Sequence, residues 1–126
     1  MDFVNRYTGI VHWLPRLVLV GIFIPHGVVK LLNPGGMMGM PAVLVFILGL
    51  MEVTGGIFIF IGPISRDILT RLGGLIITIV MLGATFMVHW PRWFFVATEA
   101  KPMGGMEFQV FTAAVALYFL VKGNDT

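Results

Sequence analysis

Four long apolar segments constrain the fold of this 126-residue chain more than any other feature of its sequence. They cover about residues 14–32, 42–61, 68–88 and 106–121, and each is close to the roughly 20 residues with which a helix crosses a ~30 Å hydrocarbon core. Only 11% of the residues are charged, and the mean hydropathy is +0.97. A water-soluble fold is therefore excluded. The prediction is an all-α integral membrane protein, with residues 1–126 forming a single four-helix transmembrane domain.

Two of these segments need a separate argument. Segment 106–121 has 16 residues, which cover only about 24 Å at ~1.5 Å per residue, so we expect it to use flanking residues or to thin the bilayer. Segment 14–32 is followed by "NPGGMMGMP" and not by a small-residue cleavage site. We therefore expect this segment to be a retained helix and not a signal peptide.

Lysine and arginine residues predict the orientation in the membrane. Those on the side of the termini and of the second loop are Arg6, Arg16, Arg66, Arg71 and Lys122. Those on the other side are Lys30, Arg92 and Lys101. This distribution predicts a bundle with both termini inside the cell. Arg16 lies near the inner end of its segment, so we expect its side chain to snorkel to the inner interface.

Several classes of chemistry are excluded by composition. The chain has no cysteine, so thiolate metal sites, iron–sulfur clusters and disulfide exchange are ruled out. The net charge of +2 is spread over loops and helix ends, so no nucleic-acid partner is expected. The outer side is rich in methionines, which are predicted to be apolar filler and not a Cu(I) site. They are Met37, Met38, Met40, Met103 and Met106. No metal site and no intrinsic cofactor are predicted.

Ionisable residues interrupt one face of each apolar segment. His26 and Lys30 share a face of the first, Glu52 lies within the second, and His89 and Glu107 lie at the outer ends of the third and fourth. A charged side chain in lipid costs at least ~3 kcal/mol, so these faces are predicted to turn inward. Side chains lean toward the N-terminus of their own helix, which directs Lys30 and Glu52 toward each other. The five residues are therefore predicted to surround one pocket in the outer half of the bilayer.

Each of these residues also has a purely structural interpretation. Lys30 and Glu52 are either a buried ion pair that sets the helix register or a ligand or proton site. His26 either bonds the carbonyl of Gly21, which Pro25 leaves without its helical partner, or exchanges protons near a headgroup. His89, next to Trp90, is predicted mainly as an interfacial anchor. Four glycines are predicted to let helix backbones approach closely: Gly55, Gly56, Gly73 and Gly74.

Three motifs in this order resemble the DoxX-like membrane proteins, a family named for the small subunit of an archaeal thiosulfate:quinone oxidoreductase. They are "RLVLVGIFIPHGVVKL", "GLMEVTGG" and "GGMEF", with "FMVHW" a looser match. The resemblance covers most of the chain and implies four helices with both termini inside, in a prokaryotic plasma membrane. It also implies links to quinone-coupled redox complexes, although membership of such a family does not by itself make the chain an enzyme.

Three functions of different class follow. The first is a subunit of a membrane-bound redox or respiratory complex, in which His26 and Lys30 bind a quinone carbonyl, Glu52 relays a proton and another subunit brings the electrons. The second is a non-catalytic structural subunit of a larger membrane complex. The third is a small-solute or proton transporter, which is disfavoured because paired repeats and discontinuous helices are not visible. The expected partners are the lipid bilayer and other membrane or redox subunits.

Overall fold

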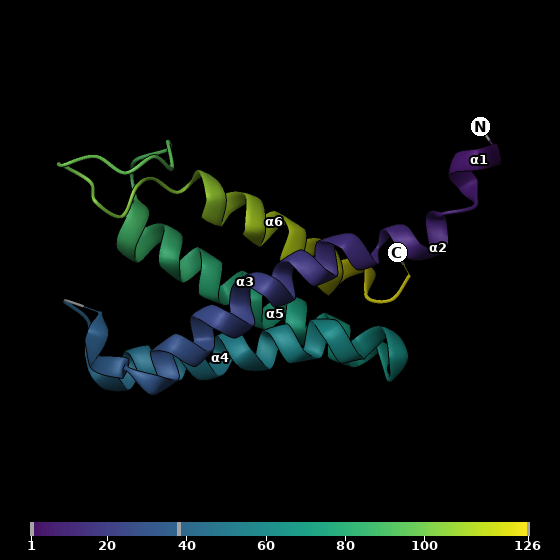
Figure 1. Cartoon of the computed structure of the whole chain (residues 1–126), viewed down its shortest axis with the longest axis horizontal. Coiled ribbons are helices and arrows are strands. Elements are labelled where there is room, and N and C mark those ends of the chain that lie inside the picture. Colours follow the sequence, from purple (N-terminus) through teal and green to yellow (C-terminus); the bar gives the residue numbers. More distant parts are fainter. Residues whose placement is uncertain (1, 38, 126) are drawn as a thin grey trace.

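The structure of the protein, a computed structural model, describes residues 2–37 and 39–125. This part of the chain is helical, with no strand (Figure 1). The α-helices are α1 (Asp2–Asn5), α2 (Thr8–Val11), α3 (Trp13–Leu32), α4 (Ala42–Ile61), α5 (Asp67–Ala84) and α6 (Glu107–Lys122). The short turns are η1 (Pro34–Gly36), η2 (Gly62–Ile64) and η3 (Thr85–His89), the last a π-helical turn that continues α5.

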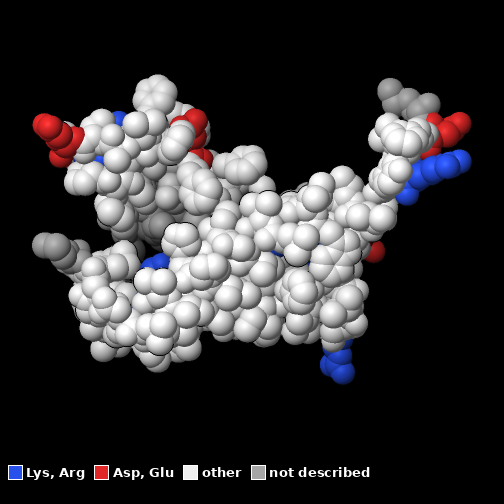
Figure 2. All heavy atoms as spheres, in the orientation of Figure 1, with Lys and Arg blue, Asp and Glu red and all other residues white. Residues whose placement is uncertain are grey.

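Three helical stretches are long and apolar enough to cross a membrane, by length and composition. They are Thr8–Leu32, Ala42–Ile64 and Asp67–His89. Figure 2 shows that the charged atoms on one face of the molecule lie mainly toward its two ends, with a wide uncharged region between them. An uncharged region of this kind suits contact with acyl chains. The chain is therefore an all-helical membrane protein.

The helices form two pairs. Helices that follow each other along the chain pack together, α3 on α4, α4 on α5 and α5 on α6. In Figure 1 α3 crosses over α5, from the C-terminal end of α6 at the right to the start of α4 at the lower left. The ends of α3 and α4 at the left lie below those of α5 and α6, so the two pairs meet near the chain termini and diverge at the other end. We call the region around Arg16 and Asn124 the closed end, and the region of residues 33–41 and 90–106 the open end. Helices α1 and α2 extend beyond the closed end (Figure 1).

Glycines bring the neighbouring backbones into contact. A Cβ atom on Gly27 of α3 would lie 2.7 Å from the carbonyl oxygen of Gly49 on α4. A Cβ on Gly73 of α5 would lie 2.9 Å from the carbonyl oxygen of Gly55, and one on Gly74 would lie 2.6 Å from a backbone oxygen of α6. Distances below about 3 Å leave no room for a side chain. The predicted packing role is confirmed for all four glycines: Gly55, Gly56, Gly73 and Gly74.

Arg16 corrects one expectation from the sequence, because its side chain is fully buried and does not snorkel to an interface. The guanidinium donates to the carbonyl oxygens of Ile59 and Gly123 and to the hydroxyl of Thr70, each at 3.1 Å. Its central carbon lies 4.4 Å from the centre of the Phe119 ring. One side chain on α3 therefore contacts residues from each of the other three long helices or their ends.

Two of the partners of Arg16 are carbonyls at the ends of helices, which explains a buried cation at this position. The carbonyl of Ile59 would normally accept from the backbone N–H of residue 63, but residue 63 is proline and has none. Gly123, with a φ of +63°, ends α6 and presents a second carbonyl. Helix C-termini carry partial negative charge, so a guanidinium placed between two of them is stabilised. The guanidinium of Arg16 thus caps both of these helix ends at once.

The C-terminal residues complete the closed end. The side-chain nitrogen of Asn124 donates to the carbonyl of Gly62 at 3.0 Å, and its side-chain oxygen accepts from Thr70 at 2.6 Å. Its backbone N–H donates to Asp67 at the start of α5. Arg71 binds Asp67 and the last carbonyls of α6. These bonds hold the end of α6 against α4 and α5, while the opposite ends of the helix pairs remain apart.

Candidate functional site

The open end contains a cavity of about 520 Å³ between the two helix pairs. Residues of α3, α4, α5, η3, α6 and both open-end loops line it, and most of the lining surface is apolar. The hollow is visible at the left of Figure 2, between the two helix pairs. It exists because the pairs are joined tightly at the closed end and diverge away from it. Polar groups on this wall are few, and they form the candidate site.

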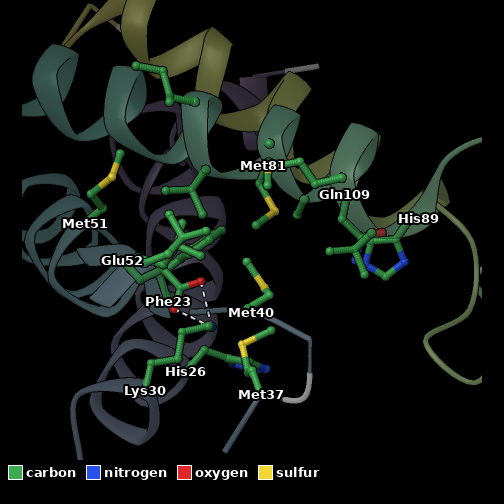
Figure 3. Close-up of a pocket in the computed structure, with 18 of the residues that line it drawn as sticks. Phe23, His26, Lys30, Met37, Met40, Met51, Glu52, Met81, His89 and Gln109 are labelled. Atoms are coloured by element: carbon green, nitrogen blue, oxygen red, sulfur yellow. Dashed lines mark hydrogen bonds and ion pairs between the residues drawn. The ribbon is translucent and has the colours of Figure 1, made fainter. Parts of the chain in front are cut away.

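Lys30 and Glu52 form the ion pair that the helix faces predict. The amine nitrogen of Lys30 lies 2.7 Å and 2.9 Å from the two carboxylate oxygens of Glu52 (Figure 3). Lys30 comes three positions after Gly27 in α3, and Glu52 comes three positions after Gly49 in α4. Each of the two residues therefore lies one helical turn along its own chain from a glycine at which the backbones touch. Glu52 is only 5% exposed. A buried carboxylate requires such a partner, and α3 provides it.

The Lys30–Glu52 pair retains capacity for a ligand. An ammonium group has three N–H donors, and two of them are directed at the carboxylate oxygens of Glu52. The Lys30 side chain is 16% exposed and lines the cavity. One N–H of Lys30 is therefore available to a carbonyl or hydroxyl oxygen in the cavity.

His26 lines the same cavity from α3. Its Nδ1 lies 2.7 Å from the carbonyl oxygen of Ile22, one turn earlier, and not beside the carbonyl of Gly21 that Pro25 leaves without its helical partner. A carbonyl can only accept, so Nδ1 carries the proton, and in the neutral ring Nε2 is an acceptor. The ring is thus oriented by its own helix.

His89 lies in the wall of the cavity and not at an exposed interface, which corrects its interpretation as an anchor. It is 7% exposed, and its Nδ1 donates to the carbonyl of Gly104 at 3.2 Å. The π-helical turn η3 carries this residue, and the loop after it folds back over the ring. Gly104 permits this fold, because it has a φ of +72° and a Cβ there would overlap the carbonyl of Phe95. Neighbouring Trp90 stays exposed.

Glu107 does not join the other four predicted residues in the cavity. It is the first residue of α6 and is not part of the cavity wall, and its carboxylate accepts from the backbone N–H of Phe95 at 3.4 Å. The physical reason is that side chains in the first turn of a helix point back toward its N-terminus, here toward the loop. His26, Lys30, Glu52 and His89 therefore share one cavity, and Glu107 supports the loop beside it.

Two further components of the cavity were not predicted. Gln109 lines it from α6, although an uncharged residue in an apolar segment gives no strong sequence signal. Six methionines also line it, from α4, α5, η3 and both loops: Met37, Met40, Met51, Met81, Met87 and Met103. Met38 lies outside the described residues. Thioether side chains are flexible and polarizable, so this wall suits a ring compound of variable substitution.

Comparison with known protein families gives one match. The DoxX family model matches residues 12–90, which contain Arg16, His26, Lys30, Glu52 and His89. The match ends before "GGMEF" and α6, so Glu107 and Gln109 lie outside it. Comparison with the curated proteins and with the solved structures gives no match. The matched residues include more than half of the chain, together with the buried ion pair at the centre of the site, and the chain therefore belongs to the DoxX family.

Proposed function

We propose that this DoxX protein is a membrane subunit of a redox or respiratory complex and that its cavity binds a quinone headgroup. In this proposal α3, α4, α5 and α6 all cross a prokaryotic plasma membrane, both termini face the cell interior, and the open end lies in the outer half of the bilayer. The observation that carries the proposal is an apolar cavity with a buried Lys30–Glu52 pair on its wall.

The size and lining of the cavity support a quinone ligand. Small-molecule sites usually enclose about 300–1,000 Å³ and combine apolar walls with a few placed polar groups. A volume of about 520 Å³, six methionines and Phe23 fit a substituted ring with the first part of an isoprenoid tail. Because the cavity lies between the helix pairs and its lining is mostly apolar, such a ligand can enter from the lipid phase.

The residues on the wall match the chemistry that this ligand needs. A bound quinone would supply reversible two-electron, two-proton chemistry. Lys30 is placed to donate a hydrogen bond to a ring oxygen, while Glu52 holds the ammonium in position. The Nε2 atom of His26 can accept or release a proton near the cavity. The chain has no cysteine, so an iron–sulfur cluster cannot be its own, and the electrons are assigned to a partner subunit.

The test is ligand-dependent stabilisation of the purified protein in lipid nanodiscs. A short-chain, redox-inactive quinone analogue should raise the unfolding temperature of the wild type. Lys30→Met should abolish the increase while keeping the helical circular dichroism spectrum, and Lys101→Met, in an exposed part of the open-end loop, should keep it. Absence of stabilisation in the wild type, or equal stabilisation of Lys30→Met, contradicts the proposal.

A structural subunit without a ligand is the second candidate. It is favoured by one observation, namely that Glu52 bonds Lys30 through both of its oxygens and needs no further partner. A pair of this kind can serve only to set the register of α3 and α4. In that case the chain should purify in mild detergent only within a stoichiometric assembly. Glu52→Gln should then weaken this assembly without changing its turnover.

A further inference from the structure

The loop between η3 and α6 carries a group of exposed aromatic side chains. Trp93, Phe94 and Phe95 are 48%, 68% and 61% exposed, and Trp90 and Val96 on either side of them are more than half exposed. In the part of the chain that the structure describes, none of these five residues lines the cavity. Large apolar side chains that lie together on the outside of a protein mark a surface that contacts another molecule or a membrane.

The start of α6 holds the backbone of residues 93–96, which we call the aromatic segment. The backbone N–H of Glu107 donates to the carbonyl of Trp93 at 2.9 Å, and the carboxylate of Glu107 accepts from the N–H of Phe95 at 3.4 Å. The segment also lies directly against Gly105, where a Cβ would overlap one of its carbonyl oxygens. The backbone that presents the aromatic side chains is therefore fixed by bonds within the protein.

The charged groups of the loop gather at a turn beside the aromatic segment. Thr98 and Lys101 exchange backbone hydrogen bonds of 3.1 Å, with Glu99 between them, and Figure 2 shows charged atoms over this loop at the upper left. Arg92 adjoins the aromatic segment, but its guanidinium donates to the hydroxyl of Thr98 at 2.7 Å. Long basic side chains at a membrane surface keep their charge among headgroups and water in this way. The loop thus has an apolar part and a charged part.

The apolar part of the loop continues the outer surface of the helices. Phe86 on η3 is 63% exposed, and the centre of its ring lies 5.5 Å from that of Trp90. Phe111 on α6 is 69% exposed. In a membrane protein, such side chains on transmembrane helices contact acyl chains. The aromatic side chains of the loop therefore extend a surface that faces lipid.

Helix α6 does not reach as far toward the open end as α5 with η3. At the closed end they are level, because the backbone N–H of Asn124, after α6, donates to Asp67, the first residue of α5. From there Asp67–His89 runs for 23 residues, whereas α6 has 16 and is therefore about 10 Å shorter at ~1.5 Å per residue. In Figure 1 the loop extends past the start of α6, toward the left. The loop therefore occupies the side of the open end where α6 falls short of η3.

We propose that the aromatic segment lies in the bilayer, at the boundary between headgroups and acyl chains in the leaflet on the side of the open end. Tryptophan and phenylalanine suit this boundary, and the charged turn then lies among headgroups and water. The bonds from Glu107 meet a requirement of this position, because lipid offers no partner to a backbone N–H or C=O. Met103 of the same loop lines the cavity, so the cavity mouth is then level with lipid.

Quenching of tryptophan fluorescence in lipid nanodiscs tests this position. Trp13→Phe together with Trp90→Phe leaves Trp93 as the one tryptophan of the chain. Lipids brominated in the upper part of the acyl chain should quench its emission strongly, lipids brominated near the chain end less, and aqueous iodide least. The control adds Trp93→Phe and Ala100→Trp, which moves the tryptophan to the charged turn. There iodide should quench strongly and both brominated lipids weakly.

Three results would overturn the proposal. Iodide quenching of Trp93 as strong as that of the tryptophan at position 100 would place the aromatic segment in water. Stronger quenching by the deep bromines than by the shallow ones would place it in the hydrocarbon core and not at the boundary. Protection from both kinds of quencher would mean that a second copy of the chain or another protein covers the segment.

A spin label gives an independent measurement that keeps all three tryptophans. The chain has no cysteine, so Phe94→Cys carries a nitroxide at a single site, and Ala100→Cys is the control. The label at position 94 should collide more often with lipid-soluble oxygen than with a water-soluble nickel complex, and the label at position 100 should show the reverse order. Helical circular dichroism checks the fold of each variant. Equal nickel access at the two positions would contradict the proposal.

These measurements are independent of the proposed function. They use no ligand of the cavity, and the aromatic segment can lie in lipid whether the cavity binds a quinone or the chain is a structural subunit. A chain that fails to bind the quinone analogue but shows the expected quenching of Trp93 therefore loses the proposed function and keeps this inference. Stabilisation by the analogue together with strong iodide quenching of Trp93 gives the opposite result.

Discussion

Replacing Arg16 with methionine tests how the closed end holds the bundle together. Methionine has a similar length and is apolar, so the change removes the guanidinium with little loss of volume. It leaves the carbonyl oxygens of Ile59 and Gly123 buried without their donor, while Thr70 keeps its bond to Asn124. Water cannot easily replace the guanidinium, because Arg16 is fully buried. The helix pairs should therefore lose one of their connections at the closed end.

The expected magnitude follows from these contacts. Each orphaned carbonyl costs about 2 kcal/mol, and loss of the stacking on Phe119 costs about 1 kcal/mol more. Release of a buried charge offsets part of this loss, because the desolvation of the guanidinium is recovered. We expect the free energy of unfolding to fall by about 3 kcal/mol in Arg16→Met. Arg16→Lys should lose less, about 1–2 kcal/mol, because it keeps the charge and loses only the planar fork.

The assay is reversible unfolding by sodium dodecyl sulfate in mixed micelles, followed by helical circular dichroism. Arg66→Met is the control, because Arg66 is exposed in the turn between α4 and α5 and should change stability by less than ~0.5 kcal/mol. If Arg16→Met unfolds at the same detergent fraction as the wild type, the carbonyls of Ile59 and Gly123 do not depend on Arg16. The interpretation of the closed end as a capped junction would then be wrong.

Three further predictions use the same unfolding assay. Gly27→Leu should lose about 1–3 kcal/mol by forcing α3 from α4, whereas Gly21→Leu, where a Cβ meets nothing within 4 Å, should be neutral; equal effects would contradict the close contact. Glu52→Leu should cost about 3 kcal/mol by leaving the ammonium of Lys30 buried and unpaired, and adding Lys30→Met should recover at least half of it; additive losses would show that the pair is not coupled. Asn124→Ala should cost about 1–2 kcal/mol through the loss of its side-chain bonds to Arg16, Thr70 and Gly62, and unchanged stability would mean that the end of α6 is held by other contacts.

Much of the fold can be predicted from the sequence because membrane helices follow simple rules. Apolar segments of the right length must be helical in lipid, since their backbone groups have no other partners there. The spacing of His26 and Lys30 places them on one face, and the cost of charge in lipid turns this face inward toward Glu52. These predictions depend only on local geometry and on the solvent, so they do not require the packing of the helices to be known.

The cavity and its exact lining could not be predicted in the same way. Glu107 and Gln109 are two positions apart on α6, yet Gln109 lines the cavity and Glu107 bonds the loop. Which of them faces inward depends on the rotation of α6 against α5 and on how far the helix pairs diverge. Hydropathy favours burial of the uncharged residue only weakly, so the sequence predicts a pocket that includes the charged Glu107 and not Gln109.

The sequence by itself determined a helical membrane protein with a buried Lys30–Glu52 pair, because hydropathy and helical periodicity act on each segment separately. Only the tertiary structure decided that Arg16 is buried and that a cavity opens at the other end. Two of the partners of Arg16 are backbone carbonyls, which every residue carries and which no sequence pattern distinguishes, apart from a proline at position 63. Four helices had to meet at one end before those carbonyls could replace the water or the acid that a buried arginine otherwise requires.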